Sequence, residues 1–167
     1  MPMGQADNAV ITELSRRFNL TFGCPVYIDT ALKLPARACH HERNQYLASG
    51  LLDMLGAVSA GENGKVLGIT GADLYAPGLN FVFGQADLTH RAVISLYRLD
   101  PRTYRLPPDN DLLLERAVKE SIHELGHTMG LTHCTNPTCV MYFSGTLDDT
   151  DRKQAAFCGQ CQPKLLK

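Results

Sequence analysis

The sequence lacks an excess of charge, a long apolar run and a recognisable secretion signal. Its 167 residues carry 16 Lys and Arg against 17 Asp and Glu, a formal net charge of −1, so no basic field points to nucleic acid. No apolar run approaches the roughly 20 residues that span a bilayer. The first seven residues have neither the basic nor the apolar region of a secretion signal. We therefore expect a cytoplasmic protein with no nucleic-acid or membrane partner.

What the chain does contain is typical of one globular domain. Hydrophobic residues make up 44% and charged residues 20%, and 167 residues suffice for a single core. Periodicity predicts helices at 8–20, 45–55 and 111–129 and a short one near 149–157, with strands at 24–28, 65–70, 80–84 and 91–97. Strands interleaved with helices predict an α/β (α+β) fold built on a mixed twisted sheet.

The helix expected at 111–129 is the most strongly marked. Its buried stripe, with one apolar residue per turn, consists of Val118, Ile122, Leu125 and Met129. Asp109 or Asn110 can cap its first turn, and Gly130 can end it in a left-handed conformation. The 37 residues after this helix are expected to have little regular structure. A segment of that length needs a metal site or disulfide bonds to stabilise it.

A metal-binding pattern lies at the end of this helix. His123 and His127 are one turn apart, so both imidazoles project from the same face and can reach one ion. Gly130 can turn the chain sharply, which allows His133 to fold back as a third ligand. Three neutral His ligands leave a fourth tetrahedral position for water, the mark of a catalytic zinc site. Glu124 stands beside the metal without ligating it.

The cysteines predict a second metal. Four of the six lie within the last 34 residues, in two short-spaced pairs: Cys134, Cys139, Cys158 and Cys161. In a reducing compartment such a set favours a closed tetrahedral zinc site over the alternative of two disulfides. Zinc would stabilise a C-terminal segment too short to build its own core.

The combined pattern resembles a known family. His123-Glu124-x-x-His127-x-x-Gly130-x-x-His133 followed by Met141 is similar to the metzincin signature. The Cys-x4-Cys-x-Met run and the closing Cys-x-x-Cys are similar to archaemetzincins (archaelysins), with a spacer before Cys158 one residue shorter than the family pattern. The motif covers residues 123–161, about a quarter of the chain.

The resemblance implies a metzincin-like fold and a role for each motif residue. The three histidines would bind catalytic zinc, Glu124 would act as general base and acid, and Met141 would form a hydrophobic floor under the metal. The four cysteines would bind a structural zinc. Phe143 stands where some metzincins place a Tyr ligand, so no such ligand is expected. We divide the single catalytic domain at Gly130, into 1–130 and 131–167.

The expected function is zinc-dependent hydrolysis of peptide bonds by a monomer. Substrate would pair with an exposed sheet edge, which we assign to Phe81, Val82, Phe83 and Gly84. Endopeptidase and aminopeptidase action both remain open. So do a zinc-stabilised peptide-binding module and a zinc amidohydrolase acting on non-peptide substrates. Two features are expected to be incidental: the run at 39–42, Cys-His-His-Glu, and Cys24, read as a small core residue of a strand.

Overall fold

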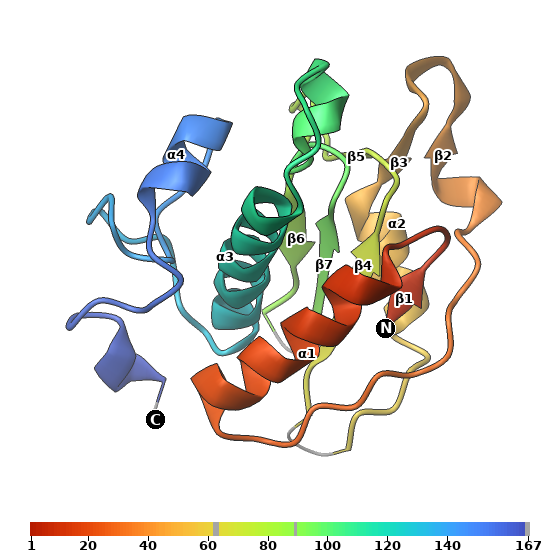
Figure 1. Cartoon of the computed structure of the whole chain (residues 1–167). Helices are drawn as coiled ribbons and strands as arrows, with labels where there is room; N and C mark the ends of the chain where they lie inside the picture. The colour runs from red at the N-terminus through yellow and green to blue at the C-terminus, as the bar shows by residue number, and fades with distance from the viewer. Residues whose placement is uncertain (62–63, 89, 166–167) are drawn as a thin grey trace.

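Figure 1 shows the fold as a computed structural model, in which residues 1–61, 64–88 and 90–165 are described. The helices are α1 (Asn8–Phe22), α2 (Ala48–Leu55), α3 (Asn110–Thr128) and α4 (Leu147–Arg152). The strands are β1 (Pro2–Met3), β2 (Cys39–His40), β3 (Gln45–Leu47), β4 (Val66–Thr70), β5 (Leu74–Tyr75), β6 (Gly84–Ala86) and β7 (Arg91–Ser95). Within these described stretches, no helix has the length and apolar character needed to cross a membrane.

The main sheet is mixed, as the sequence predicts. Its order is β1-β4-β7-β6, with the first three strands parallel and β6 antiparallel to β7 at one edge. The connection from β1 to β4 includes α1 and α2, which provides the crossover that parallel neighbours require. A second, smaller sheet has the order β2-β3-β5.

Helices cover both faces of the main sheet. On β7, Ala92 and Ile94 pack into the core that also contains α1 and α3, whereas Val93 packs into the core that contains α2. This alternation follows from the two-residue period of a strand. Figure 1 shows α1 and α3 on one side of the sheet and α2 on the other. Packing against the sheet therefore positions α3.

The ends of α3 are set by local signals. The Asp109 carboxylate accepts a hydrogen bond from the Leu112 amide (2.9 Å), which caps the first turn. At the other end Gly130 has φ = 84°, a left-handed conformation that glycine adopts without strain. The predicted helix and both of its end signals are confirmed.

One predicted strand is wrong. Residues 24–28 form no strand, Cys24 is exposed and not a core residue, and Tyr27 is 86% exposed. The position beside β4 that such a strand could take is already filled by β1. Pro25 also lacks the amide hydrogen that a ladder needs.

Three other predicted elements are shifted. The stretch at 45–47 is strand β3, so α2 begins only at Ala48. At 80–84 the regular strand starts at Gly84, because Val82 bonds to Leu74 of the small sheet instead. The last helix covers Leu147–Arg152, where a capping box between Thr146 and Asp149 fixes its start.

Candidate metal centres

The first histidine pair projects from one face of α3. The Nε2 atoms of His123 and His127 are 3.0 Å apart, while each Nδ1–H donates to a backbone carbonyl. His123 donates to Val140 (2.8 Å), and His127 donates to Leu131 (2.8 Å). A carbonyl oxygen only accepts, so the proton of each neutral ring sits on Nδ1 and each Nε2 carries a lone pair. Two lone pairs at this distance repel each other unless a cation lies between them.

His133 completes the set. The left-handed Gly130 turns the chain, and the amide of Leu131 bonds back to the Gly126 carbonyl (3.0 Å). The ring of His133 then lies 5.3 Å from that of His123, centroid to centroid, and one nitrogen of each of the three rings falls within 4.8 Å of the others. Tetrahedral zinc with bonds of about 2.0–2.1 Å separates its nitrogen ligands by roughly 3.3 Å. The donor set and its spacing fit one such ion.

The charge state of these rings also suits a metal. Burial lowers the pKa of His123 well below its usual range, and burial also lowers the pKa values of His127 and His133. Each ring is therefore neutral at physiological pH, the form that ligates a metal.

Glu124 is buried beside the histidines and beneath the sheet edge. A Cβ added to Gly84 of β6 would lie 2.7 Å from its Cγ, so this strand approaches closely because it has a glycine there. Burial raises the pKa of Glu124 well above its usual value, and the nearby Glu120 adds to this. A bound cation would act in the opposite direction.

Met141 lies in a tight turn over Cys139–Tyr142, the Met-turn, closed by the Tyr142 amide on the Cys139 carbonyl (2.9 Å). Its side chain is fully buried against α3. A Cβ on Gly126 would lie 2.5 Å from the Met141 sulfur, so the helix needs glycine here. The preceding residue, Val140, accepts the hydrogen bond from His123. The turn thus supports the histidine cluster from below.

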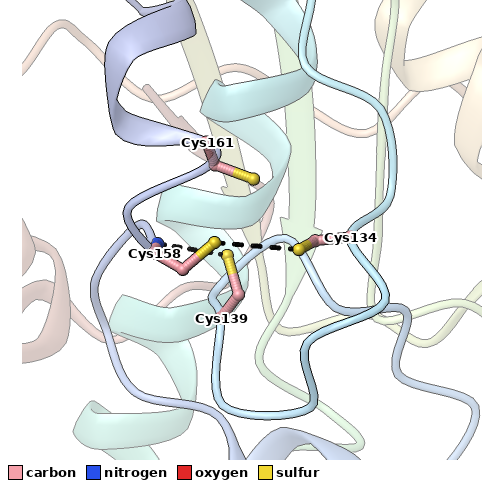
Figure 2. A group of neighbouring side chains, drawn as sticks. All are labelled: Cys134, Cys139, Cys158 and Cys161. Carbon is pink, nitrogen blue, oxygen red and sulfur yellow. Dashed lines mark hydrogen bonds between the residues drawn. The ribbon is translucent and has the colours of Figure 1, made fainter.

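The four C-terminal cysteines form a second cluster (Figure 2). Their sulfur atoms all lie within 4.8 Å of one another, and those of Cys134 and Cys158 are 3.8 Å apart. Zinc–sulfur bonds of about 2.3 Å in a tetrahedron give about the same separation. A disulfide would bring two sulfurs to about 2.05 Å. All six cysteines are free. The geometry therefore fits a metal better than the two-disulfide alternative.

Backbone amides prepare one of these thiols for ligation. Hydrogen bonds from the amides of Gln160 and Cys161 lower the pKa of Cys158 to about 6. Burial raises the pKa values of Cys139 and Cys161. Because a zinc ligand must be a thiolate, a metal bound at this cluster would release protons from Cys139 and Cys161.

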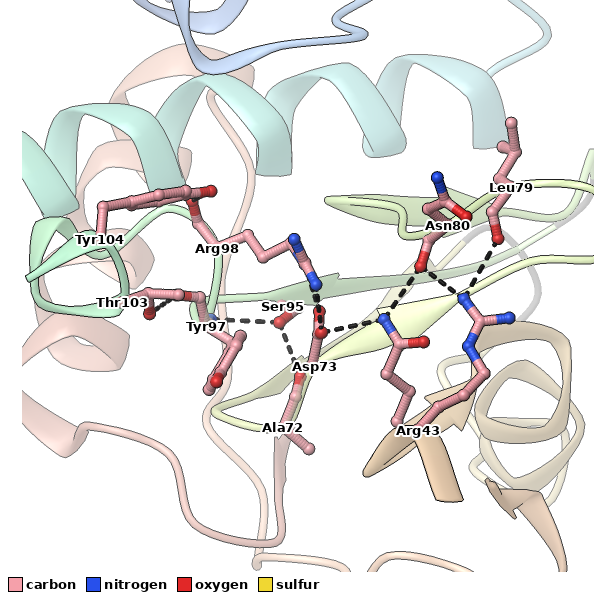
Figure 3. A network of polar contacts seen from close by, with 11 residues as sticks. Arg43, Ala72, Asp73, Leu79, Asn80, Ser95, Tyr97, Arg98, Thr103 and Tyr104 are labelled. Atoms are coloured by element: carbon pink, nitrogen blue, oxygen red, sulfur yellow. Dashed lines mark hydrogen bonds and ion pairs between the residues drawn. The ribbon is translucent and has the colours of Figure 1, made fainter. Parts of the chain in front are cut away.

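The segment before β6 is held by contacts from the region of the small sheet and from Arg98, which follows β7 (Figure 3). The Asn80 carbonyl accepts from Arg43 (2.6 Å) and from the buried Gln45 (3.0 Å). The guanidinium of Arg98 pairs with both oxygens of Asp73 (2.8 Å each). That guanidinium also covers the Phe81 ring at 4.4 Å.

These contacts place the predicted edge residues in two environments. Phe83 is buried, and its carbonyl accepts from Ser95 of β7 (2.8 Å). Phe81 is partly exposed and packs edge-on against the Phe83 ring. Sequence reasoning missed the Asp73–Arg98 pair, because two residues 25 positions apart leave no spacing pattern.

The Cys-His-His-Glu run at 39–42 forms no metal cluster. Cys39 lies 3.7 Å from His41 Nδ1, whereas the His40 ring packs edge-on against Tyr75. Throughout the described part of the chain, only the histidine and four-cysteine clusters gather three or more potential ligands.

Comparison with known proteins decides the family. A family model described as Peptidase family M54 matches residues 8–167. The chain belongs to peptidase family M54. The M54 assignment extends the resemblance, which rests on residues 123–161, to nearly the whole chain, and confirms it. The chain is accordingly a zinc-dependent metallopeptidase, which favours the enzyme over a binding module.

Relatives within the M54 family match over most of their length. An archaemetzincin of Pyrococcus furiosus is 44% identical over 172 residues, covering 99% of this chain and 90% of that protein. One of Methanopyrus kandleri is 55% identical over 136 residues, covering 81% and 74%.

Solved structures share the fold. The archaemetzincin of Archaeoglobus fulgidus, complexed with malonate, has a TM-score of 0.85 at 38% identity and covers 98% of this chain and 96% of that one. A zinc-dependent peptidase of Methanocorpusculum labreanum has a TM-score of 0.88 at 32% identity, covering 98% and 97%. The predicted metzincin-like α/β fold is confirmed.

Proposed function

We propose that the histidine cluster holds the catalytic zinc of this peptidase and that Glu124 is its general base and acid. The observation that carries the proposal is the pair of facing Nε2 lone pairs on His123 and His127, 3.0 Å apart, with both Nδ1 protons committed to carbonyls. His133 supplies the third nitrogen. Met141 forms the floor beneath the site.

His123, His127 and His133 would hold the zinc, which would supply a water with its pKa lowered to about 7 and polarise a substrate carbonyl. Glu124, fixed beside His123, takes the proton from the attacking water and delivers it to the departing amine. Because the Glu124 side chain is buried, bulk water does not compete for that proton. The rings of His123 and His127 stay neutral throughout, since each keeps its Nδ1 proton, which it donates to a backbone carbonyl.

Substrate binding is proposed at the edge of the main sheet. Strand β6 is an edge strand, and its Gly84 lies against Glu124, so an extended peptide along this edge passes the general base. The residues proposed to border the peptide are Phe81, Val82, Phe83 and Gly84. Main-chain pairing of this kind binds peptides with little sequence preference. Endopeptidase action requires that the site accept the middle of such a peptide, whereas aminopeptidase action requires that the peptide end at its N-terminus within the site.

The four-cysteine cluster is proposed to hold a second, structural zinc. Two zinc ions add four positive charges and four thiolates add four negative ones, so the formal charge of −1 is unchanged. A thiolate site also fits the proposed cytoplasmic location, where cysteines stay reduced. We further propose that the chain is a monomer. Within it, 1–130 and 131–167 meet at one catalytic site, because the first part supplies His123 and His127 and the second part supplies His133.

Elemental analysis tests both metal assignments together. We expect two zinc ions per chain in the purified protein and one in the His127→Ala variant, because that variant keeps all four thiols. Light scattering on the same samples gives the oligomeric state. A single zinc in the wild type that survives His127→Ala would contradict the proposed catalytic site.

A further inference from the structure

A fully buried ion pair lies behind the histidine cluster. Lys153, the residue after α4, sends its side chain inward to Glu120 of α3 (2.9 Å), and the two side chains are 0% and 3% exposed. The Thr150 hydroxyl also donates to Glu120 (3.1 Å). No motif marks this pair in the sequence, because its members are 33 residues apart.

Attachment of α4 to α3 does not require this pair. Asp151 of α4 already accepts two hydrogen bonds from Arg116 of α3 (2.7 and 2.6 Å), and its carbonyl accepts one from Lys119 (3.0 Å). Replacing a buried ion pair by apolar side chains of similar size is often neutral for stability or favourable. A role beyond holding the two helices together is therefore indicated.

The second contact of the Lys153 ammonium leads to the histidine cluster. Its Nζ donates a long hydrogen bond to the Tyr142 carbonyl (3.4 Å), at the end of the Met-turn. The Met-turn supports Met141 and carries the Val140 carbonyl that holds His123 in its tautomer. On α3, Glu120 lies three residues before His123, on neighbouring positions of the helix surface.

We propose that Lys153 is a positioning residue for the peptidase reaction, whose buried ammonium holds the Met-turn against the active-site helix. This inference rests on the proposed function of the histidine cluster. The ammonium bridges an acidic side chain of α3 and a carbonyl of the Met-turn. The floor and the hydrogen-bond acceptor of the catalytic site thereby keep a fixed distance from the helix that carries the ligands. Hydrogen-bond partners of metal ligands typically contribute 10- to 100-fold in metal affinity or activity, and Lys153 acts on such a partner, the Val140 carbonyl, through the Met-turn.

Three variants separate positioning from stability. Lys153→Met leaves Glu120 buried without its partner, and we expect the equilibrium constant for unfolding to rise about 100-fold or more. The double variant Glu120→Gln/Lys153→Met removes both charges at nearly constant volume and should regain most of that stability. Asp151→Asn is the control, because it weakens the attachment of α4 to α3 without touching the Met-turn.

The double variant is measured for kcat, KM and the affinity of the catalytic zinc, the last by competition with a chelator. We expect kcat and zinc affinity each to fall about 10- to 100-fold with KM nearly unchanged, while Asp151→Asn keeps both. A double variant with wild-type kcat and zinc affinity would overturn the inference and leave the pair a structural one. The zinc measurement needs no turnover, so it decides the inference even if the wild type cleaves no peptide tested.

Discussion

The orientation of two imidazoles in the histidine cluster is set by backbone carbonyls of the segment that follows α3. Val140 and Leu131 each accept one Nδ1–H, which leaves the facing nitrogens of His123 and His127 free for a metal. The ligands themselves could be predicted from their spacing, because one turn of a helix places both rings on one face. Their carbonyl partners could not, because no pattern in the sequence marks a backbone acceptor.

Gly84 is the residue whose replacement tests the contact between the proposed substrate edge and the proposed general base, Glu124. In Gly84→Ala the new Cβ meets Glu124 at 2.7 Å and the Val93 carbonyl at 2.8 Å, so the carboxylate or the strand must shift. We expect kcat/KM to fall about 10- to 100-fold, because small displacements of reacting groups are costly. Steady-state kinetics on a peptide substrate measures this.

Gly50→Ala is the matched control. Its Cβ meets Ala38 at 2.8 Å, an equally close contact in the α2 region. If both variants lose the same activity, the loss in Gly84→Ala reflects general destabilisation and not the position of Glu124.

At the scale of elements, sequence patterns confined to one helix predict that helix correctly. Patterns for strands predict less well, because a strand also needs a free neighbour in the sheet. The stripe and the end signals of α3 are local, so the sequence predicts the helix and the placement of the five motif residues on or just after it. The failed strand at 24–28 depends on a place in the sheet that the two-residue β1 already fills. Such a short strand carries no periodicity of its own.

The four-cysteine cluster and the third histidine are adjacent in the chain, which predicts that the two sites are coupled. Cys158→Ala removes one thiolate, and the loosened segment then holds His133 less firmly through its neighbour Cys134. We expect loss of the structural zinc and a fall in kcat of about 10- to 100-fold. Zinc content and steady-state kinetics of the variant check this.

Cys24→Ala provides the comparison, since Cys24 is exposed and belongs to neither cluster. It should keep two zinc ions and full activity. Full catalytic zinc occupancy and wild-type kcat in Cys158→Ala would show that the two sites are independent.

Over the whole molecule, the sequence predicts the fold class from its interleaved strands and helices, and both clusters from the regular spacing of their histidines and cysteines. The contacts that join the small sheet to the substrate edge, and α4 to α3, link residues 25 to 37 positions apart without any repeated spacing. Only packing brings these groups together. They are the part of the site that the structure adds.

Metal removal should proceed in two stages. A site with three imidazoles and an open position releases zinc more readily than a closed site of four thiolates. We therefore expect a mild chelator to abolish activity while circular dichroism and the unfolding midpoint change little. Removal of the second zinc should lower the midpoint, because the C-terminal segment has little core of its own. Loss of both zinc ions in one step, together with unfolding, would contradict two sites of different character.

The central claim, that Glu124 beside the histidine cluster carries out peptide hydrolysis, is tested most directly by mass-spectrometric profiling. A diverse peptide library is incubated with the zinc-loaded wild type, with Glu124→Ala, and with Glu115→Ala as a control from the exposed side of α3. We expect cuts with the wild type and with Glu115→Ala, and a rate lower by about 10²- to 10⁴-fold with Glu124→Ala at unchanged zinc content. Internal cuts would identify an endopeptidase and stepwise loss of N-terminal residues an aminopeptidase. Cleavage by Glu124→Ala at the wild-type rate would contradict the account.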